Sequence, residues 1–159
     1  MAQFTLHSPT FHGQVPTAHV YHDFGAGGDN QSPALSWSDA PAGTKSYLLV
    51  LHDVDAPGPG GWWHWCAFNI PADVSELALD ASQQGMPTGT VQVKNSYGSI
   101  GFGGACPPPG DQGHTYLMTL YALDTEKLEL DENTSPAMVL FVANAHVLGK
   151  AGLVAYYAR

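Results

Sequence analysis

Residues 46–70, SYLLVLHDVDAPGPGGWWHWCAFNI, contain two apolar runs on either side of a turn. The first run, residues 46–51, is short and apolar, and the turn sequence Pro57-Gly58-Pro59-Gly60-Gly61 follows it. The apolar pattern resumes at residue 62 and continues to residue 70. We therefore predict two buried β-strands separated by a glycine-rich turn.

Turn-forming residues separate the remaining apolar runs as well. The 18 glycines and 12 prolines make up 30 of the 159 residues and cluster between short apolar stretches, which is typical of an all-β domain. Further strands are predicted at residues 116–123 and, as a weaker pattern, 91–93. Residues 4–6 and 153–157 are candidates near the termini. This spacing favours a sandwich.

One helix is predicted late in the sequence. Ser135 is a suitable N-cap, Pro136 suits the first helical position, and Gly149-Lys150 would end the helix. Five apolar residues follow a helical period, and we expect them to pack on the sheets: Met138, Phe141, Val142, Ala145 and Leu148.

Length and charge restrict the classes of function. A chain of 159 residues corresponds to one domain, which needs no disulfide or metal merely to fold. Five Lys and Arg against 14 Asp and Glu give a net charge of 5 − 14 = −9, which argues against nucleic acids and anionic membranes as partners. No apolar run approaches the roughly 18 residues of a membrane-spanning helix. Because no basic segment precedes Lys45, we expect a cytoplasmic protein with free thiols at Cys66 and Cys106.

Polar residues cluster at the end of the first apolar run. Asp53 and Asp55 are two residues apart, so an extended chain presents both carboxylates on one face. If the two strands pair across the turn, His64 approaches these carboxylates, which would orient its ring and favour the imidazolium form. The alternative is that both aspartates cap the turn by accepting hydrogen bonds from backbone amides.

A second cluster combines glycines with a histidine. Residues 98–110, GSIGFGGACPPPG, are followed by His114-Thr115-Tyr116 at the start of a predicted strand. Glycines let the backbone approach a ligand closely, and their exposed amides can hold an anion without Lys or Arg. The alternative is a tight loop without a ligand. A dinucleotide-binding motif is excluded because prolines stand where its helix would begin.

A metal site is another interpretation of the same residues. Strand alternation would place His64 and Cys66 on one face, and further potential ligands are Asp53, Asp55, Cys106 and His114. These residues lack a diagnostic ligand spacing. A metal-assisted or His-Asp hydrolase of phosphorylated substrates would need such a ligand set or an activated nucleophile. We therefore expect no catalytic residue, no metal and no cofactor.

Taken in order, these segments resemble the phosphatidylethanolamine-binding protein family, in its bacterial branch termed Raf kinase inhibitor-like. The resemblance runs nearly end to end, and the combination is highly specific. It rests on Ser32-Pro33-Ala34-Leu35-Ser36-Trp37, Asp53-Val54-Asp55-Ala56-Pro57, His64-Trp65 with Asn69-Ile70-Pro71, and Gly103-Gly104-Ala105-Cys106-Pro107-Pro108 with His114 and Tyr116.

The resemblance implies a mainly β fold over a single domain, residues 1–159. Its two antiparallel sheets would form a Greek-key sandwich with one or two short peripheral helices. It also implies a small pocket at one end that binds phosphate or a phosphoryl head group. The matched positions would build the pocket from Asp53, Asp55, His64 and His114, with Pro57, Trp62, Gly104 and Tyr116 in its wall.

By the same resemblance, we expect a non-enzymatic module that binds a phosphorylated small molecule or a lipid head group. A kinase or a protease would be its protein partner, and a homodimer its assembly. Family members often have a cis bond at the position of Ala56-Pro57. Thr115 stands where the family has an arginine, so anion binding should depend more on histidine protonation and weaken as pH rises through the histidine pKa.

Overall fold

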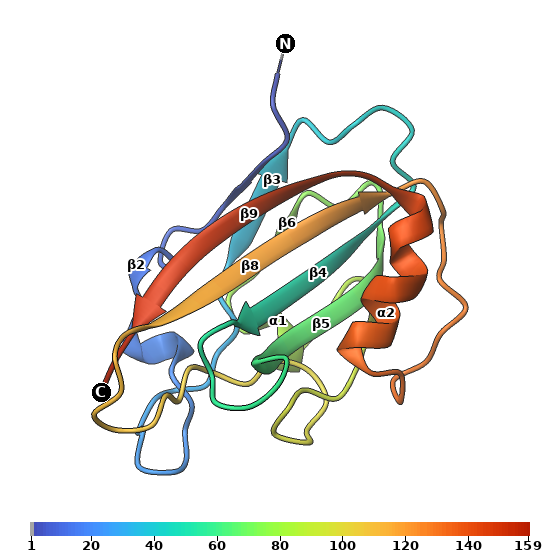
Figure 1. Cartoon of the computed structure of the whole chain (residues 1–159). Coiled ribbons are helices and arrows are strands. Elements are labelled where there is room, and N and C mark those ends of the chain that lie inside the picture. Colours follow the sequence, from blue (N-terminus) through green and yellow to red (C-terminus); the bar gives the residue numbers. More distant parts are fainter. Residues whose placement is uncertain (1) are drawn as a thin grey trace.

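The computed structural model describes residues 2–159, and two β-sheets form its framework (Figure 1). The large sheet has the order β2-β9-β8-β4-β5-β7, and the small sheet has the order β1-β3-β6. The large-sheet strands are β2 (Gly13–Gln14), β4 (Ser46–Asp53), β5 (Trp62–Pro71), β7 (Val91–Gln92), β8 (His114–Leu123) and β9 (Val147–Tyr157). The small-sheet strands are β1 (Thr5–His7), β3 (Leu35–Ser38) and β6 (Glu76–Leu77).

The predicted mainly β sandwich is confirmed. Strand β8 returns to lie beside β4, so β8-β4-β5-β7 follow the order of a Greek key. The strand pairs are antiparallel, apart from the short parallel pairing of β2 with β9. The helices are short: α1 (Ala81–Gln84), α2 (Pro136–Ala143) and two 3₁₀ turns, Thr17–His19 and Asn144–His146. None of the helices within residues 2–159 is long and apolar enough to cross a bilayer.

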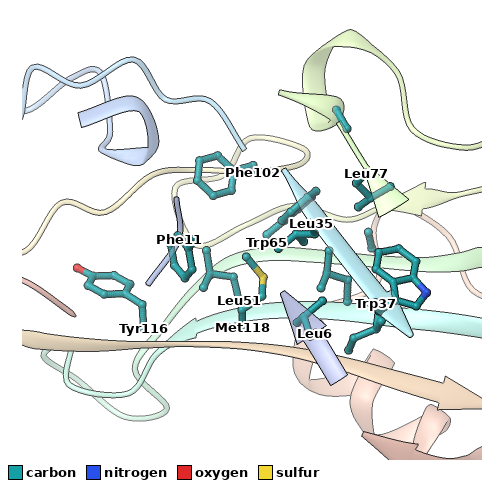
Figure 2. Close-up of a cluster of buried hydrophobic side chains, with 14 of the residues drawn as sticks. Leu6, Phe11, Leu35, Trp37, Leu51, Trp65, Leu77, Phe102, Tyr116 and Met118 are labelled. Carbon is teal, nitrogen blue, oxygen red and sulfur yellow. The ribbon is translucent and has the colours of Figure 1, made fainter. Parts of the chain in front are cut away.

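Strand β4 separates two layers of the core because its side chains alternate between faces. Tyr47, Leu49 and Leu51 join the buried cluster between the two sheets, part of which is shown in Figure 2. Leu48 and Val50 point the other way, into the layer beneath α2. Burial of each leucine side chain contributes roughly 1.5–3 kcal/mol. This anchoring holds the polar end of β4 in place.

Helix α2 begins where predicted but ends earlier. Ser135 Oγ accepts a hydrogen bond from the backbone N–H of Met138, and Pro136 occupies the first turn. The α-helix ends at Ala143, and Gly149-Lys150, predicted to end it, lies within β9 together with Leu148. Pairing of β9 with β8 continues back to Val147, so this segment is a strand rather than the last helical turn.

The predicted buried face of α2 was wrong for most of its residues. Val139 and Ala143 are buried, whereas Met138 is 50% exposed and Phe141 is 78% exposed. Of the other predicted positions, Val142 is half-buried and packs against the buried layer as predicted, whereas Ala145 and Leu148 are exposed. All eight residues of α2 are apolar, so the sequence pattern did not distinguish one face from another.

Candidate functional site

Three strands of the large sheet bring polar residues to one end of the sandwich. Strand β4 ends at Asp53, and the antiparallel neighbours β5 and β8 begin there. Asp53 pairs with Trp62 on one side and with Tyr116 on the other. Because alternate residues of a strand share a face, His114 lies on the same inner face as Tyr116.

His64 reaches this face through a β-bulge. Consecutive residues of β4 pair with Trp63 and Trp65, which leaves His64 as the extra residue of β5. A bulge redirects the side chain next to it, and His64 lines the same cavity as Asp53. The prediction that His64 and Cys66 share a face was therefore wrong, since Cys66 is buried in the layer beneath α2.

The strand ends line a cavity of about 480 Å³, a volume typical of ligand pockets. Its charged or readily titratable lining residues are Asp53, His64, Cys106, His114 and Arg159. The remaining lining residues are Phe24, Ala56, Pro57, Trp62, Ser96, Tyr97, Pro107 and Pro108. Within residues 2–159, no three His, Cys, Asp or Glu side chains are grouped as a metal ion would require.

His114 lies between two carboxylates. Its Nδ1 is 2.6 Å from Oδ2 of Asp53, and its Nε2 is 3.1 Å from Oδ2 of Asp111. Burial by itself lowers the pKa of His114, but the hydrogen bonds and charges of Asp53 and Asp111 outweigh burial and raise it. Only the imidazolium carries a proton on both nitrogens, so only this form donates to both carboxylates.

His64 has the opposite electrostatic character. Its Nδ1 is 2.7 Å from the carbonyl oxygen of Gly103, which can only accept, so Nδ1 carries the proton. Burial lowers the pKa of His64 to about 4, against smaller upward effects of the Gly103 carbonyl and Asp53. The ring is therefore neutral at pH 7, and the expected imidazolium at His64 was wrong. Its Nε2 makes no hydrogen bond of standard geometry within residues 2–159, although the Gly104 carbonyl also raises the pKa of the ring slightly.

Five of the eight predicted pocket residues line the cavity: Asp53, Pro57, Trp62, His64 and His114. Asp55 does not, because its side chain is exposed and Oδ2 accepts a hydrogen bond from the backbone N–H of Thr115 at 2.7 Å. The backbone N–H of Asp55 donates to Oδ1 of Asp53 at 2.9 Å. The capping role considered as an alternative therefore describes Asp55 better than a role in the cavity wall.

Gly104 and Tyr116 lie behind the cavity lining. The Gly104 carbonyl accepts a hydrogen bond from the Tyr97 hydroxyl at 2.7 Å. Tyr116 is 1% exposed and packs edge-on against His64, with ring centroids 5.4 Å apart. Its hydroxyl is buried near Asp53 without a hydrogen bond of standard geometry to a described residue. Both residues support the lining side chains from behind.

The amides of residues 103–105 in the glycine-rich loop are paired within the fold and are not free to hold an anion as predicted. The N–H groups of Gly103 and Ala105 donate to the carbonyls of His64 and His19, at 2.8 and 3.1 Å. The Gly104 N–H donates to Asn30 Oδ1 at 2.7 Å. These bonds fix the loop against its neighbours. The expected cis bond at Ala56-Pro57 was also wrong, because residues 2–159 contain no cis peptide bond.

Sequence reasoning missed Arg159, the only arginine in the sequence. Its Nε donates to the carbonyl of Pro107 at 2.6 Å, and its Nη2 donates to the carbonyl of Phe24 at 3.2 Å. These two bonds hold a guanidinium at the cavity, whereas Thr115 led us to expect a site without an arginine. A single arginine in a chain of net charge −9 is a signal that could have identified it.

The fold is a β-sandwich with a small cavity at the ends of its central strands, which is the shape of site that small ligands occupy. The chain belongs to the phosphatidylethanolamine-binding protein family, whose model matches residues 8–158. Membership of this family supports a binding module.

Two bacterial relatives illustrate the similarity. The chain is 46% identical to the UPF0098 protein YbcL of Escherichia coli (strain K12) over 147 residues, 91% of this chain and 80% of YbcL. It is 42% identical to YbhB of the same organism over 146 residues, 91% of this chain and 92% of YbhB.

Solved structures share the fold. The crystal structure of E. coli YbcL, presented as a new member of the mammalian PEBP family, superposes with a TM-score of 0.96 and 44% identity over 99% of both chains. A putative phosphatidylethanolamine-binding protein homologue, CT736 from Chlamydia trachomatis, gives a TM-score of 0.83 and 30% identity, covering 100% of this chain and 99% of CT736.

Proposed function

We propose that the protein is a non-enzymatic binding module that holds a phosphate or phosphoryl-type anion in the cavity lined by His64, His114 and Arg159. The position of Arg159 carries this proposal. The chain has only five basic residues, and its single guanidinium lines the cavity. A guanidinium presents several N–H donors in a plane that matches the oxygens of a phosphate group.

An unused hydrogen-bond donor supports the same conclusion. The indole Nε1 of Trp62 is buried without a hydrogen-bond partner among the described residues, and Trp62 lines the cavity. A buried donor that stays unpaired costs about 1–3 kcal/mol. A ligand oxygen that reached Nε1 would accept this bond.

The charges around the cavity give anion binding a defined pH dependence. Asp53 and Asp111 carry two negative charges, and protonated His114 and Arg159 carry two positive charges, so the sum is 2 − 2 = 0. When His114 loses its proton, the sum becomes −1. Anion binding should therefore weaken as pH rises through the raised pKa of His114.

A binding role fits the lining residues better than catalysis. Ser96 and Cys106 are the hydroxyl and thiol nucleophile candidates in the lining. Ser96 Oγ accepts a hydrogen bond from the backbone N–H of Trp63 at 2.8 Å, and Cys106 Sγ lies 3.5 Å from Nη2 of Arg159. Neither candidate is hydrogen-bonded to an imidazole of residues 2–159, an arrangement that would activate it.

Titration of ¹⁵N-labelled protein with inorganic phosphate tests the proposal. The indole N–H signal of Trp62 should shift in a saturable way. That of Trp65, which donates to Gln92 Oε1 at 2.8 Å, should stay in place as an internal reference. Arg159→Gln should abolish the shift, and Lys150→Gln, at an exposed position of β9, should leave it unchanged. Absence of a saturable Trp62 shift in the unmodified protein would rule out anion binding here.

A further inference from the structure

The cavity contains a hydrogen-bond acceptor as well as donors. His64 is 2% exposed and lines the cavity. Its one hydrogen bond of standard geometry within residues 2–159 is made by Nδ1, and the Gly104 carbonyl makes only a weaker contact with the ring. Because Nδ1 carries the proton, Nε2 presents a lone pair. The Asp53 carboxylate, 3% exposed, lines the same cavity. A ligand that complements this part of the wall must donate a hydrogen bond to His64 Nε2.

A fully ionised oxyanion cannot do so, because all of its oxygens are acceptors. One of them would face the lone pair of His64 Nε2 close to the negative charge of Asp53. An oxyanion that keeps one acidic proton donates its O–H to Nε2 and still offers its other oxygens to Trp62 and Arg159. This arrangement pairs the lone pair of His64 Nε2 and the donors of Trp62 and Arg159.

We propose that the cavity selects a monoanionic phosphate group that carries a P–OH, which donates to His64 Nε2. Inorganic phosphate and phosphomonoesters offer this group in their monoanionic state. Phosphodiesters and sulfate esters do not, although they carry the same single charge. The proposal rests on the proposed anion-binding function and specifies its ligand class.

The surroundings of His64 prevent it from becoming a donor at Nε2. Presenting an N–H there would require either a second proton or loss of the 2.7 Å bond to Gly103. Burial opposes the second proton most strongly, and the nearby charge of His52 opposes it further. The Gly103 carbonyl, Asp53 and the Gly104 carbonyl favour it, but more weakly than burial opposes it. The rings of Tyr116 and Tyr97 pack edge-on against His64 at 5.4 and 5.8 Å and hold its orientation.

The other titratable side chains next to His64 do not offer a second neutral acceptor for the ligand's proton. The Tyr97 hydroxyl already donates to the Gly104 carbonyl, and burial raises the pKa of both Tyr97 and Tyr116, so both phenols remain protonated. His114 has both nitrogens directed at carboxylates. Selection for a protonated ligand therefore depends on His64. The negative charge of Asp53 adds to this selection because it repels a fully ionised anion.

Methyl phosphate and methyl sulfate form a matched pair for testing this selection. The methyl phosphate monoanion and methyl sulfate have the same charge and nearly the same shape, but only methyl phosphate has an acidic proton. Calorimetric titration at about pH 5.5, below the second phosphate pKa of about 6, should give roughly 5- to 100-fold tighter binding of methyl phosphate. The preference should fall at about pH 8, where methyl phosphate becomes a dianion. Methyl sulfate keeps its charge, so its own pH dependence reports the protein groups, His114 included.

The outcomes separate this inference from the proposed function. Equal affinity for the two esters at about pH 5.5 would overturn proton selection while leaving anion binding intact. Binding of neither ester nor inorganic phosphate would overturn the proposed function itself. The inference is supported if methyl phosphate or inorganic phosphate binds more tightly than methyl sulfate. The comparison of methyl phosphate with inorganic phosphate then shows whether a phosphomonoester or free phosphate is preferred.

Imidazole ¹⁵N spectra of the unmodified protein provide a direct check. At pH 7 without ligand, His64 should show a protonated Nδ1 and an unprotonated Nε2. Methyl phosphate should move the Nε2 signal away from its free lone-pair position, and methyl sulfate should not. A protonated Nε2 in the free protein would overturn the inference without any ligand measurement.

Discussion

Replacement of His114 with leucine should destabilise the fold far more than the same change at His146. Both imidazoles contact a carboxylate at a similar distance: His114 Nδ1 is 2.6 Å from Asp53, and His146 Nδ1 is 2.8 Å from Asp124. The pairs differ in burial, with side-chain exposures of 4% and 4% for the first and 39% and 49% for the second. Removing one partner of a buried pair costs about 3–5 kcal/mol, whereas an exposed pair contributes about 0–1 kcal/mol.

The cost at His114 should depend on pH. The fold raises the pKa of His114, so the stability that its charge contributes is fully present below the unfolded pKa of about 6.5. That contribution is lost as pH rises through the folded pKa. The His114→Leu variant has no such group. The free energy of unfolding that the variant lacks relative to the unmodified protein should therefore be larger near pH 6.5 than at about pH 9.

Urea unfolding followed by tryptophan fluorescence measures both effects, and an unchanged dependence on urea confirms that the same transition is compared. A loss of about 3–5 kcal/mol corresponds to a melting temperature about 6–20 °C lower for a chain of this size. Equal losses in the His114 and His146 variants would refute the conclusion that burial sets the value of the pair. A deficit that is constant with pH would refute the assignment of His114 as the charged partner.

Three further predictions test the packing around the site and beneath α2. Gly104→Ala should lower the free energy of unfolding by about 1–3 kcal/mol, measured by thermal unfolding, because the new Cβ would lie 2.5–2.6 Å from backbone atoms. Gly113→Ala is the control: no atom lies within 4 Å of its new Cβ, so stability should change by at most about 0.5 kcal/mol. Val139→Ala should lower the free energy of unfolding by about 1.5–3 kcal/mol and Phe141→Ala by no more than about 0.5 kcal/mol, because Val139 is buried and Phe141 is exposed. A larger loss at Phe141 than at Val139 would support the helix face predicted from sequence. Burial raises the pKa of the Cys66 thiol to about 12, so a thiol reagent at pH 8 should modify Cys106 of the folded protein and leave Cys66 unmodified. Peptide mapping measures this, and rapid labelling of Cys66 would contradict its burial.

The long strands were predictable because their signals are local. Residues 46–51 and 62–70 combine apolar runs with a glycine-rich turn, and they correspond to β4 and β5. The structure adds three strands that were not predicted: β2, β3 and β6. β2 and β6 are two residues long and form through pairing with distant segments, so no window of sequence contains their signal. β3 has a local signal, the alternation Leu35-Ser36-Trp37-Ser38, but it is only four residues long.

The candidate site was only partly predictable, since its chemistry depends on one inserted residue. Strict alternation placed His64 beside Cys66, but the bulge in β5 moves His64 to the inner face. The proton on His64 is then set by the Gly103 carbonyl, which is 39 residues away in the sequence. Arg159 reaches the cavity through bonds to Pro107 and Phe24 that exist only in the fold.

The two histidines of the site show why residue type alone does not define its chemistry. His64 and His114 are similarly buried, at 2% and 3% exposure, yet one is neutral and the other favours its charged form. The difference follows from their partners, because one backbone carbonyl stabilises the charge of an imidazolium less than two carboxylates do. A site with two imidazolium groups would favour the most highly charged anion available. One imidazolium with one neutral acceptor instead favours an anion that retains a proton, so the Gly103 carbonyl contributes to ligand choice without lining the cavity.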